Sequence, residues 1–549
     1  MTSSQNIDKD NQLRNLVRKY NQAEVTIPYP GAKAIDVITR NVSITSVKDK
    51  KVFIVISPRT IDWFLAAKYN YSILERADIK GVVSAESVIQ AMDWQTYPTY
   101  LQYDSIVRSF ARLYPSICHL DSIGTSNYGK KVFALKISDN VATNENEPEV
   151  FYSSTIHGDE IAGYVLMLRL ADYLLKNYNL NTRVTNMVDN LEIWINPLAN
   201  PDGTYGTGNA LTSPVRGNAF GYDLNRNFPE PPYTSYVPQK ENADMIKFLR
   251  KHRFVISANF HSGAEVVNYP WDKSLSLIHA DNLWFNSISR AYVDTVHKYS
   301  GPAYLADLDN GVTRGAVWYI IHGGRQDFVT YELQGREVTI EIDDAIPTPA
   351  AQLEPLWQYN WRSLLGYLEN ALYGIHGVVK DTHTSNPVPA KIFISGHDKD
   401  SSQIYSDTLS GNFLRMLSPG LWNLTFSANS YRDTTINSIS VVAGQRTNLI
   451  VEMKSLTTSS IDTTDPKVPL LYPNPASNYI MARLPEKLSG RINIKIINQS
   501  GAKMTDYDKD FAFGYPFEID VRNLSGGVYT IIFKNINSGL SYRSRFVVL

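Results

Sequence analysis

The segment "EVFYSSTIHGDEIAGYVLMLRLADYLLKNY", residues 149–178, joins a strand pattern to a helix pattern through a short polar turn. Residues 149–156 form an apolar run that is typical of a buried strand. Residues 161–178 have the spacing of apolar side chains that predicts an amphipathic helix. His157 and Glu160 stand between the two patterns. We therefore expect a potential metal-binding pair at the carboxyl end of a strand, although this spacing alone also fits an ordinary solvated turn.

The same alternation continues on both sides of this segment, from about residue 95 to residue 372. "LEIWINP" and "FVISANF" have the pattern of further buried strands, and "LEPLWQYNWRSLLGYLENALYGI" has that of a long helix. Strands that alternate with helices predict an α/β fold. We expect a mixed or largely parallel central sheet that is flanked by helices.

Composition limits the possible partners and ligands. The chain has 549 residues, too many for one core, so two to four domains are expected. Lys and Arg number 53 against 54 Asp and Glu, which gives no reason to expect nucleic acid or an anionic membrane as a partner. No apolar run reaches the ~20 residues of a membrane-spanning helix. The single Cys118 excludes an internal disulfide and a cysteine-based zinc cluster, so a metal site has to use His and carboxylates.

The sequence divides around the α/β part. Residues 14–85 contain short strand and helix patterns and predict a small N-terminal α+β unit. Residues 374–454 and 470–549 contain short strands of period two, which predict two C-terminal all-β sandwich domains. Residues 455–469 are polar and rich in Ser and Thr, and we interpret them as a linker.

A third candidate ligand, His261, follows the strand pattern "FVISANF". A lone His at a strand end is more often a packed, hydrogen-bonded residue than a ligand. In open α/β sheets, however, the carboxyl ends of the strands form the ligand site, so His157, Glu160 and His261 are expected to converge there. Two His and one Glu leave one position of a tetrahedral zinc open, as a catalytic zinc site requires.

Two more segments add polar residues with matching chemistry. "RGNAFGYDLNRNFP" includes Arg216, Asp223, Asn225 and Arg226, and "AVWYIIHGGRQDF" with "REVTIEIDD" includes Tyr319, Gln326, Asp327 and Glu341. Taken singly, each residue also fits a surface, cap or core position. Together with "HGDE", "NPLANPDG" and "NFHSG…VVNYP", in this order and at these spacings, residues 95–372 resemble the zinc metallocarboxypeptidases. The resemblance is closest to their regulatory branch, the carboxypeptidase E, D, M and N type.

The resemblance implies one Zn²⁺ per chain, held by His157, Glu160 and His261. It implies the following roles for the loop residues: Asp223 orients a zinc-binding imidazole, Arg216 polarises the scissile carbonyl, Asn225 and Arg226 hold the terminal carboxylate of the substrate, and Tyr319 closes over the substrate. These roles suit the residue types, because a guanidinium binds a carboxylate with two parallel hydrogen bonds.

The resemblance assigns the general base to Glu341 in "VTIEI". Glu332 and Glu337 are the nearby alternatives. A carboxylate can take a proton from water and pass it to the leaving amine, which peptide hydrolysis requires. His279, His297 and His322 match no role, and we interpret them as structural.

Asp272 and Gln326 correspond to the two positions that line the specificity pocket in the regulatory branch. The resemblance therefore implies release of C-terminal Lys or Arg. A cation that enters a partly dry pocket needs an opposing carboxylate. The alternative is that Asp272 faces outward and pairs on the surface.

The flanking parts have resemblances of their own. Residues 374–454 resemble the transthyretin-like domain of the regulatory carboxypeptidases. Residues 470–549, with "LYPNPASN" and "LSGGVYTIIF", resemble the type IX secretion sorting domain of Bacteroidetes proteins, although the ending "SRFVVL" lacks the usual final Lys. This implies the type IX machinery as a partner and a secreted or cell-surface protein. The start of the sequence shows no signal-peptide core. Residues 14–85 stand where metallocarboxypeptidases can carry a prodomain.

The leading hypothesis is a secreted zinc carboxypeptidase that acts on peptide or protein C-termini. One alternative is a non-catalytic peptide-binding surface protein, which is expected to have lost ligands or the base. The other is a zinc deacylase of the aspartoacylase type, which shares the zinc ligands. The Asn225–Arg226 pair, Tyr319 and the sandwich disfavour the deacylase.

Overall fold

The structure is a computed structural model that describes residues 3–549, except residues 77–78, 144, 231–236, 457–467 and 512–516. The chain forms two compact units, Met1–Leu456 and Thr457–Leu549. The predicted linker 455–469 lies largely outside the described residues.

The first part of the larger unit is a small α+β fold, here called the N-terminal unit (residues 3–76). Its sheet has the strand order β2-β3-β1-β4 and is antiparallel throughout. The elements are α1 (Ser3–Tyr20), β1 (Ala23–Pro28), α2 (Ala32–Thr39), β2 (Ser43–Lys48), β3 (Lys51–Ile56), α3 (Ile61–Ala66) and β4 (Ser72–Ile73). Its apolar core also includes Tyr319, which comes from the central part of the chain.

The central part is built on an eight-stranded sheet with the order β11-β10-β12-β9-β7-β8-β6-β5. The four middle strands, β12, β9, β7 and β8, are parallel, and antiparallel strands flank them, so the predicted mixed sheet is confirmed. The strands are β5 (Cys118–Thr125), β6 (Lys131–Ile137), β7 (Glu149–Ser154), β8 (Glu192–Asn196), β9 (Phe254–His261), β10 (Ala264–Tyr269), β11 (Val312–Arg314) and β12 (Arg336–Asp343).

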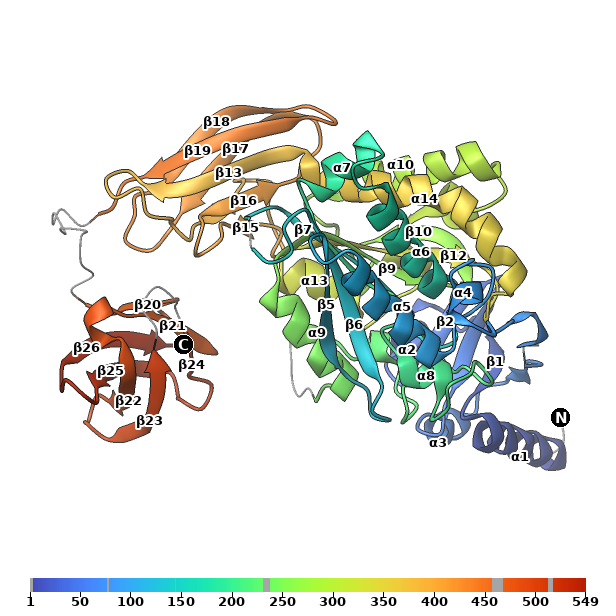
Figure 1. The fold of residues 1–549 in the computed structure, drawn as a ribbon. Coiled ribbons are helices and arrows are strands. Elements are labelled where there is room, and N and C mark those ends of the chain that lie inside the picture. The colour runs from blue at the N-terminus through green and yellow to red at the C-terminus, as the bar shows by residue number, and fades with distance from the viewer. Residues whose placement is uncertain (1–2, 77–78, 144, 231–236, 457–467, 512–516) are drawn as a thin grey trace. The chain divides into compact units, whose positions relative to one another are not determined.

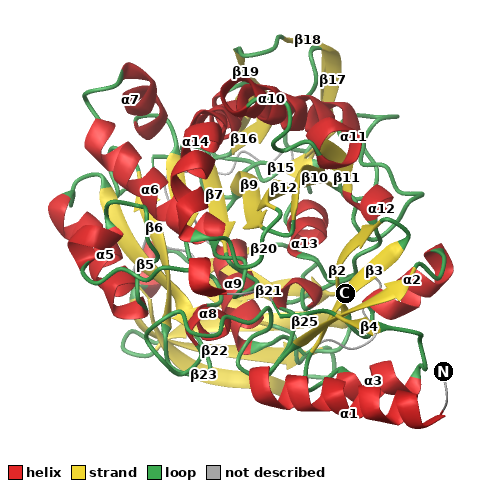
Figure 2. Cartoon of the chain, turned by 90° about the vertical axis from the view of Figure 1, so that its right-hand side faces the viewer, coloured by secondary structure: helices red, strands yellow, loops and turns green. Residues whose placement is uncertain are grey.

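Both faces of this sheet are buried under helices. Along β7, Val150 and Tyr152 belong to one apolar cluster, whereas Phe151 between them belongs to another on the opposite face. A strand covered on both faces needs apolar residues at every position, which explains the continuous apolar run in the sequence. Figures 1 and 2 show the covering helices. Those of the larger cluster are α5 (Tyr100–Leu113), α6 (Ala162–Asn177), α10 (Asn282–Ser300) and α14 (Leu353–Glu369), and α9 (Lys240–Lys251) and α13 (Arg325–Glu332) contribute to the other.

Shorter helices connect these elements. They are η1 (Ile79–Gly81), α4 (Val88–Ala91), α7 (Thr182–Val188), α8 (Pro201–Tyr205), η2 (Leu224–Arg226), α11 (Asp307–Gly311), α12 (Gly315–Trp318), η3 (Ala350–Gln352) and η4 (Asn370–Leu372). Of these, η2 carries Asn225 and Arg226.

An all-β sandwich follows the central part. Its two sheets have the orders β16-β13-β19 and β15-β14-β17-β18. The strands are β13 (Gly374–Asp381), β14 (Lys391–Phe393), β15 (Ile404–Tyr405), β16 (Asn412–Arg415), β17 (Gly420–Ser427), β18 (Thr434–Val441) and β19 (Arg446–Met453). Apolar residues from both sheets form its core.

A buried ion network joins this sandwich to the central part. Asp281, which precedes α10, accepts hydrogen bonds from Arg336 at the start of β12 (2.6 Å) and from Arg415 at the end of β16 (2.6 and 3.1 Å). Arg415 also donates to Asp398 of the sandwich (2.7 Å). Burial favours a raised pKa at Asp281, but the two guanidinium groups hold its pKa far below the usual range. The carboxylate is therefore ionised and links the two folds.

We expect Asp281→Asn to lower the free energy of unfolding of the larger unit by about 3–5 kcal/mol, because it leaves two buried guanidinium groups without a full counter-charge. Urea unfolding followed by tryptophan fluorescence measures this. The matched control is Asp104→Asn, which removes an ion pair with Arg108 on the surface of α5 and is expected to cost less than about 1 kcal/mol. Equal costs for the two variants would show that the network is not a main stabilising element.

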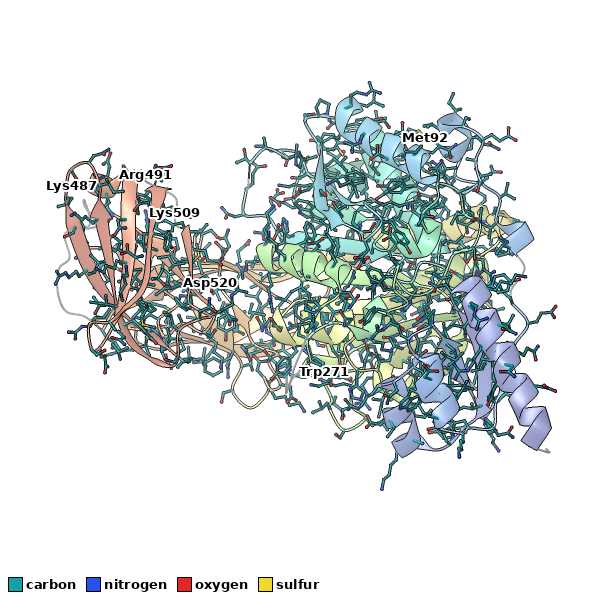
Figure 3. All side chains as sticks on the ribbon, turned by 90° about the horizontal axis from the view of Figure 1, so that it is seen from below. Met92, Trp271, Lys487, Arg491, Lys509 and Asp520 are labelled. Atoms are coloured by element: carbon teal, nitrogen blue, oxygen red, sulfur yellow. The ribbon has the colours of Figure 1, made fainter. Side chains whose placement is uncertain are left out.

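The C-terminal unit is a second all-β sandwich with its own apolar core. Its sheets have the orders β20-β21-β24 and β23-β22-β25-β26. The elements are β20 (Leu470–Tyr472), β21 (Tyr479–Arg483), η5 (Glu486–Leu488), β22 (Gly490–Asn498), β23 (Lys503–Phe511), β24 (Phe517–Asp520), β25 (Gly527–Asn535) and β26 (Ser541–Val548). Charged side chains such as Lys487, Arg491, Lys509 and Asp520 are exposed or partly exposed on this unit (Figure 3). Across the described part of both units, none of the helices combines the length and the apolar character that crossing a membrane requires.

Candidate metal centre and substrate cleft

The pairing of β7 with β9 brings the three predicted metal ligands together. The two strands are parallel neighbours, with Ser154 opposite Phe260, so their carboxyl ends lie side by side. His261 is the last residue of β9, and the turn after β7 carries His157 and Glu160. All three side chains are buried, and their ligand atoms lie within 4.8 Å of one another. The predicted convergence is confirmed.

The three side chains place their ligand atoms close enough together to share one metal ion. Nδ1 of His157 lies 2.8 Å from Oε1 of Glu160, and Nδ1 of His261 lies 2.8 Å from Oε2. The two Nδ1 atoms are 3.1 Å apart, close to the separation of about 3.4 Å that two nitrogen ligands have on a tetrahedral zinc. Two imidazole nitrogens and a carboxylate that face one point form a donor set that suits Zn²⁺.

The outer nitrogens of both imidazoles have partners that fix the required tautomer. Nε2 of His157 lies 2.9 Å from Oδ1 of Asp223, so the carboxylate holds the proton there and leaves Nδ1 free to bind a metal. Nε2 of His261 lies 2.7 Å from the amide of Asn259, whose other end has no partner among the described residues. We assign the amide oxygen to the side of Nε2, since the network decides the orientation of an amide. Burial lowers the pKa of His261 to about 4, which keeps it neutral, as a zinc ligand must be.

We expect His261→Ala to lose most of the zinc that the purified protein holds, because two ligands remain of three. Inductively coupled plasma mass spectrometry measures the metal content. His119→Ala, at an exposed position of β5, is the control and is expected to keep one zinc per chain. Full occupancy in the His261→Ala variant would remove this residue from the site.

The loop before and within η2 places a cation and a carboxylate beside the ligands. The guanidinium of Arg216 donates from Nη1 to Oε1 of Glu160 (2.7 Å) and from Nε to Oδ2 of Asp223 (3.1 Å). Burial alone favours a raised pKa at Asp223, but Arg216 and His157 hold that pKa well below its usual range. Asp223 is therefore an ionised bridge between the imidazole and the guanidinium.

The same loop presents the two residues predicted to bind a carboxylate. Asp223 caps the turn by accepting from the backbone N–H of Asn225 (2.9 Å). The side-chain oxygen of Asn225 accepts from the backbone N–H of Arg325 (2.9 Å), which fixes the amide. Arg226 donates from Nη1 to the carbonyl of Asn225 (3.0 Å), and its buried Nε has no partner in the part of the chain that the structure describes.

Glu341 faces the metal centre from β12. This strand is parallel to β9, and Glu341 lies directly opposite His261 in the register, so both side chains point to the same face of the sheet. The buried Oε2 of Glu341 has no hydrogen-bond partner among the residues described. Burial raises the pKa of Glu341 well above its usual value, and the nearby Glu160 adds to the effect. The carboxyl group of Glu341 therefore has a raised affinity for a proton and an oxygen atom free of hydrogen bonds to the described residues.

The two alternative candidates for the base are engaged elsewhere. Glu337 forms a buried ion pair with Arg325 (2.9 Å) and accepts from the hydroxyl of Ser257 (2.7 Å). Glu332, at the end of α13, pairs with Arg250 on α9. Neither contact involves a metal ligand.

Asp272 and Gln326, the two residues expected to line the specificity pocket, are buried and lie in contact with each other. The amide nitrogen of Gln326 donates to Oδ1 of Asp272 (2.9 Å), and only 4% of Asp272 is exposed, so this carboxylate does not pair on the surface. Asp327 holds the segment in place by accepting from the backbone N–H groups of Asp272 and Lys273 (3.0 Å each). Trp271, buried just before Asp272, is labelled in Figure 3.

The structure also brings residues to the cleft that the sequence analysis did not select. The N-terminal unit contributes Gln22, Ser43 and Ile44, and the hydroxyl of Tyr319 donates to the carbonyl of Ile44 (3.3 Å). No local pattern could have identified these residues, because their hydrogen-bond partners lie more than a hundred positions away in the chain. Asp159 could have been found, since it stands inside "HGDE" next to a predicted ligand.

The three His residues interpreted as structural lie away from the ligands. His322 bridges Asp36 of the N-terminal unit (2.7 Å) and Glu230 (2.9 Å). His279 is buried near Asp281, and His297 hydrogen-bonds the carbonyl of Leu305.

Comparisons with known proteins agree with this geometry. Residues 103–363 match the sequence profile described as "Zinc carboxypeptidase", and residues 470–548 match the "Secretion system C-terminal sorting domain". Carboxypeptidase D of Rattus norvegicus is 31% identical over 376 residues, which are 65% of this chain and 27% of that protein. The catalytic chain of human carboxypeptidase N is 31% identical over 381 residues, covering 61% of this chain and 81% of that protein.

Among solved structures, carboxypeptidase A of Helicoverpa armigera has a TM-score of 0.48 and 16% identity, and the match covers 63% of this chain and 96% of that one. These sequence matches define the class of the protein as a metallopeptidase. The match to carboxypeptidase N extends over 81% of that protein, which is enough to assign the family. The chain belongs to the zinc carboxypeptidase family. It spans about a quarter of the length of carboxypeptidase D.

Proposed function

We propose that the protein is a zinc carboxypeptidase that acts outside the cell and releases Lys or Arg from the C-terminus of peptides. The observation that carries the specificity is the buried pair Asp272 and Gln326. The carboxylate and the amide oxygen of this pair offer only acceptors to a side chain that enters the pocket. The oxygen of Gln326 is buried and has no partner among the described residues.

The pocket suits a long cationic side chain. A buried carboxylate without a counter-charge is costly, and burial together with the nearby Asp327 raises the pKa of Asp272 well above its usual value. An ammonium or guanidinium group from a substrate supplies the missing charge and the missing donors. The absence of a side chain at Gly315 leaves room for the carboxylate of Asp272 in this position, because an added Cβ would lie 1.7 Å from Oδ1 of Asp272.

Arg226 and Asn225 suit the terminal carboxylate that distinguishes a carboxypeptidase substrate. Arg226 turns its guanidinium group toward the cleft and can bind a carboxylate through two hydrogen bonds. A Cβ added at Gly324 would lie 3.6 Å from Oδ2 of Asp272 and 3.9 Å from the carbonyl oxygen of Asn225, which supports a carboxylate site and a side-chain pocket close to each other. One C-terminal residue can therefore satisfy both.

The reaction adds water across the last peptide bond. Zinc, when bound, supplies Lewis-acid activation at this site. Glu341 accepts the proton of the attacking water and returns it to the amine nitrogen as the C–N bond breaks, so that a free amino acid and a shortened peptide leave. Arg216 stabilises the negative charge that develops on the carbonyl oxygen.

We expect Glu341→Gln to lower kcat by at least about 1000-fold and to leave the zinc content unchanged, because the amide keeps the shape but cannot accept a proton. Release of Arg from a peptide with a C-terminal Arg measures the rate. Glu332→Gln, which changes an ion pair outside the cleft, is the control. Near-normal turnover of the Glu341→Gln variant would place the base elsewhere.

We expect Asp272→Ala to lower kcat/KM for a peptide ending in Arg by about 100-fold or more, and to change that for a matched peptide ending in Leu by less than about 3-fold. The reason is that only the cationic side chain uses the carboxylate. Asp93→Ala, at an exposed position, is the control. If the unsubstituted enzyme releases Leu as fast as Arg, the pocket assignment is wrong.

The C-terminal unit supports the proposed location. Its match to a secretion sorting domain indicates export, and we propose that the type IX machinery carries the chain across the outer membrane. The sandwich that follows the catalytic part, joined to it by the Asp281 network, is proposed to be a structural, transthyretin-like domain.

A further inference from the structure

The first turn of α13 supports the proposed substrate site at three successive positions. Arg325 donates from its backbone N–H to Oδ1 of Asn225 (2.9 Å). Gln326 donates from its side-chain amide to Oδ1 of Asp272 (2.9 Å), and Asp327 accepts from the backbone N–H of Asp272 (3.0 Å). A displacement of this turn therefore moves both parts of the site that the proposed function gives to the C-terminal residue of a substrate.

The bond from Arg325 decides which end of the Asn225 amide is left for a substrate. A backbone N–H can only donate, so the oxygen of the amide lies on the side of Arg325. The NH₂ group, which can only donate, is left for another partner. A donor is what the terminal carboxylate of a peptide requires, and the opposite orientation would offer it an acceptor. The place of the Arg325 backbone thus sets the polarity of the carboxylate site.

The side chain of Arg325 fastens this turn to the central sheet. Its guanidinium forms two hydrogen bonds with the carboxylate of Glu337 on β12, from Nε to Oε1 (2.9 Å) and from Nη2 to Oε2 (3.3 Å), and both side chains are fully buried. On β9, the carbonyl of Ala258 accepts from Nη2 (3.4 Å), and the hydroxyl of Ser257 donates to Oε2 of Glu337 (2.7 Å). The guanidinium also lies 5.5 Å from the ring centre of Phe151 on β7. The ion pair therefore connects α13 with three strands.

Two of these strands also carry the metal centre. In the parallel pairing of β9 with β12, Glu337 lies opposite Ser257, and four positions further along Glu341 lies opposite His261. Side chains four positions apart on a strand face the same side, and a rise of about 3.3 Å per residue separates the two facing pairs by about 13 Å. One facing pair holds the turn of α13, and the other holds a metal ligand and the proposed base. The sheet thus fixes the distance between them.

Stability alone does not account for a buried ion pair at this place. The cost of removing two charges from water offsets much of their attraction, and apolar replacements of buried ion pairs are often neutral for stability. The fork of a guanidinium on a carboxylate, however, is satisfied in one geometry only, because its two hydrogen bonds are directional. The pair of Arg325 and Glu337 therefore restricts the position of the turn more narrowly than an apolar contact of the same size.

We propose that the buried ion pair of Arg325 and Glu337 is a positioning element for substrate binding. It sets the first turn of α13 at a fixed distance from the metal centre. It thereby places the amide of Asn225 for the terminal carboxylate and the amide of Gln326 for the side chain of the C-terminal residue. Both members of the pair act through these amides. The inference rests on the proposed function, which gives the C-terminal residue these partners.

The first experiment replaces both members of the pair, because the loss of one alone leaves the other charged and buried. In Arg325→Met, Glu337→Gln protein, the glutamine keeps an acceptor for the hydroxyl of Ser257, and the methionine fills most of the space of the arginine stem. KM is expected to rise about 10-fold or more for a peptide ending in Arg and about 3-fold or more for a matched peptide ending in Leu. We expect kcat to stay within about 3-fold and zinc to stay at one per chain, because the ligands and Glu341 keep their places.

The matched control is the buried ion pair of Lys136 and Glu192 (3.0 Å), which joins β6 to β8. Lys136→Met, Glu192→Gln removes a buried pair in the same way and is expected to leave both KM values within about 2-fold. A merely structural role would lower the melting temperature of both double variants and leave KM unchanged. An unchanged KM in the Arg325→Met, Glu337→Gln protein, an equal rise in the control, or a fall in kcat alone would overturn the proposal.

A conservative variant tests the geometry of the pair apart from its charge. Arg325→Lys keeps the cation but cannot form the two parallel hydrogen bonds, so its KM for the Arg peptide is expected to lie between those of the unsubstituted enzyme and the double variant. This variant also carries the test by itself if the double variant does not fold. A KM equal to that of the unsubstituted enzyme would show that the fork is not what positions the turn.

Binding without hydrolysis separates this inference from the proposed function. A peptide ending in Arg, with a fluorophore at its N-terminus, is titrated into Glu341→Gln protein with and without the Arg325→Met, Glu337→Gln changes. If the unsubstituted enzyme releases no C-terminal residue but removal of the pair weakens peptide binding about 10-fold, the proposed function fails and the inference stands. If the enzyme releases Arg and Kd is the same with and without the pair, the inference fails and the proposed function stands.

Discussion

The parallel pairing of β7 with β9 is the constraint on which the site depends. It aligns the ends of two buried strands, so that a His and a Glu from one turn meet a His from the next strand. The parallel pairing of β12 on the other side of β9 then fixes Glu341 opposite His261. His261 and Glu341 therefore stand on main-chain hydrogen bonds of a sheet that is buried on both faces, and their spacing is as rigid as the sheet itself. The turn after β7 supplies the other two ligands, and the loop before and within η2 supplies Arg216, Asp223, Asn225 and Arg226.

The sequence predicted most of this central part for physical reasons. Strands covered on both faces need an apolar residue at every position, and "EVFYS" and "FVISANF" show that pattern directly. The strand ends then located the metal ligands, because the carboxyl ends of parallel strands meet at one edge. The alternation of strand and helix patterns predicted the mixed sheet and the small N-terminal fold. The period-two pattern of apolar residues predicted the two sandwiches, and the structure confirms this fold class.

The contacts that the sequence did not reveal are the long-range polar ones. Nothing near Gln22 or Ile44 in the chain marks them as neighbours of Arg216 and Arg226, since a carbonyl oxygen belongs to every residue and carries no sequence signal. The partners of the imidazoles differ in this respect. Asn259 lies two positions before His261, on the same face of the strand, and a search for partners on that face could have found it. The ion network around Asp281 was also invisible, because its members come from three distant segments.

The position of Tyr319 links two parts of the molecule that the chain order separates. Its ring belongs to the apolar core of the N-terminal unit, together with Trp318 and Ile321 that pack against this core. The segment that carries the ring is thus shared between two folds, and neither fold is complete without it. Separation of the two folds would expose these three side chains to water, which disfavours it. The apolar core of the N-terminal unit therefore depends on a segment that follows it by more than two hundred residues in the chain.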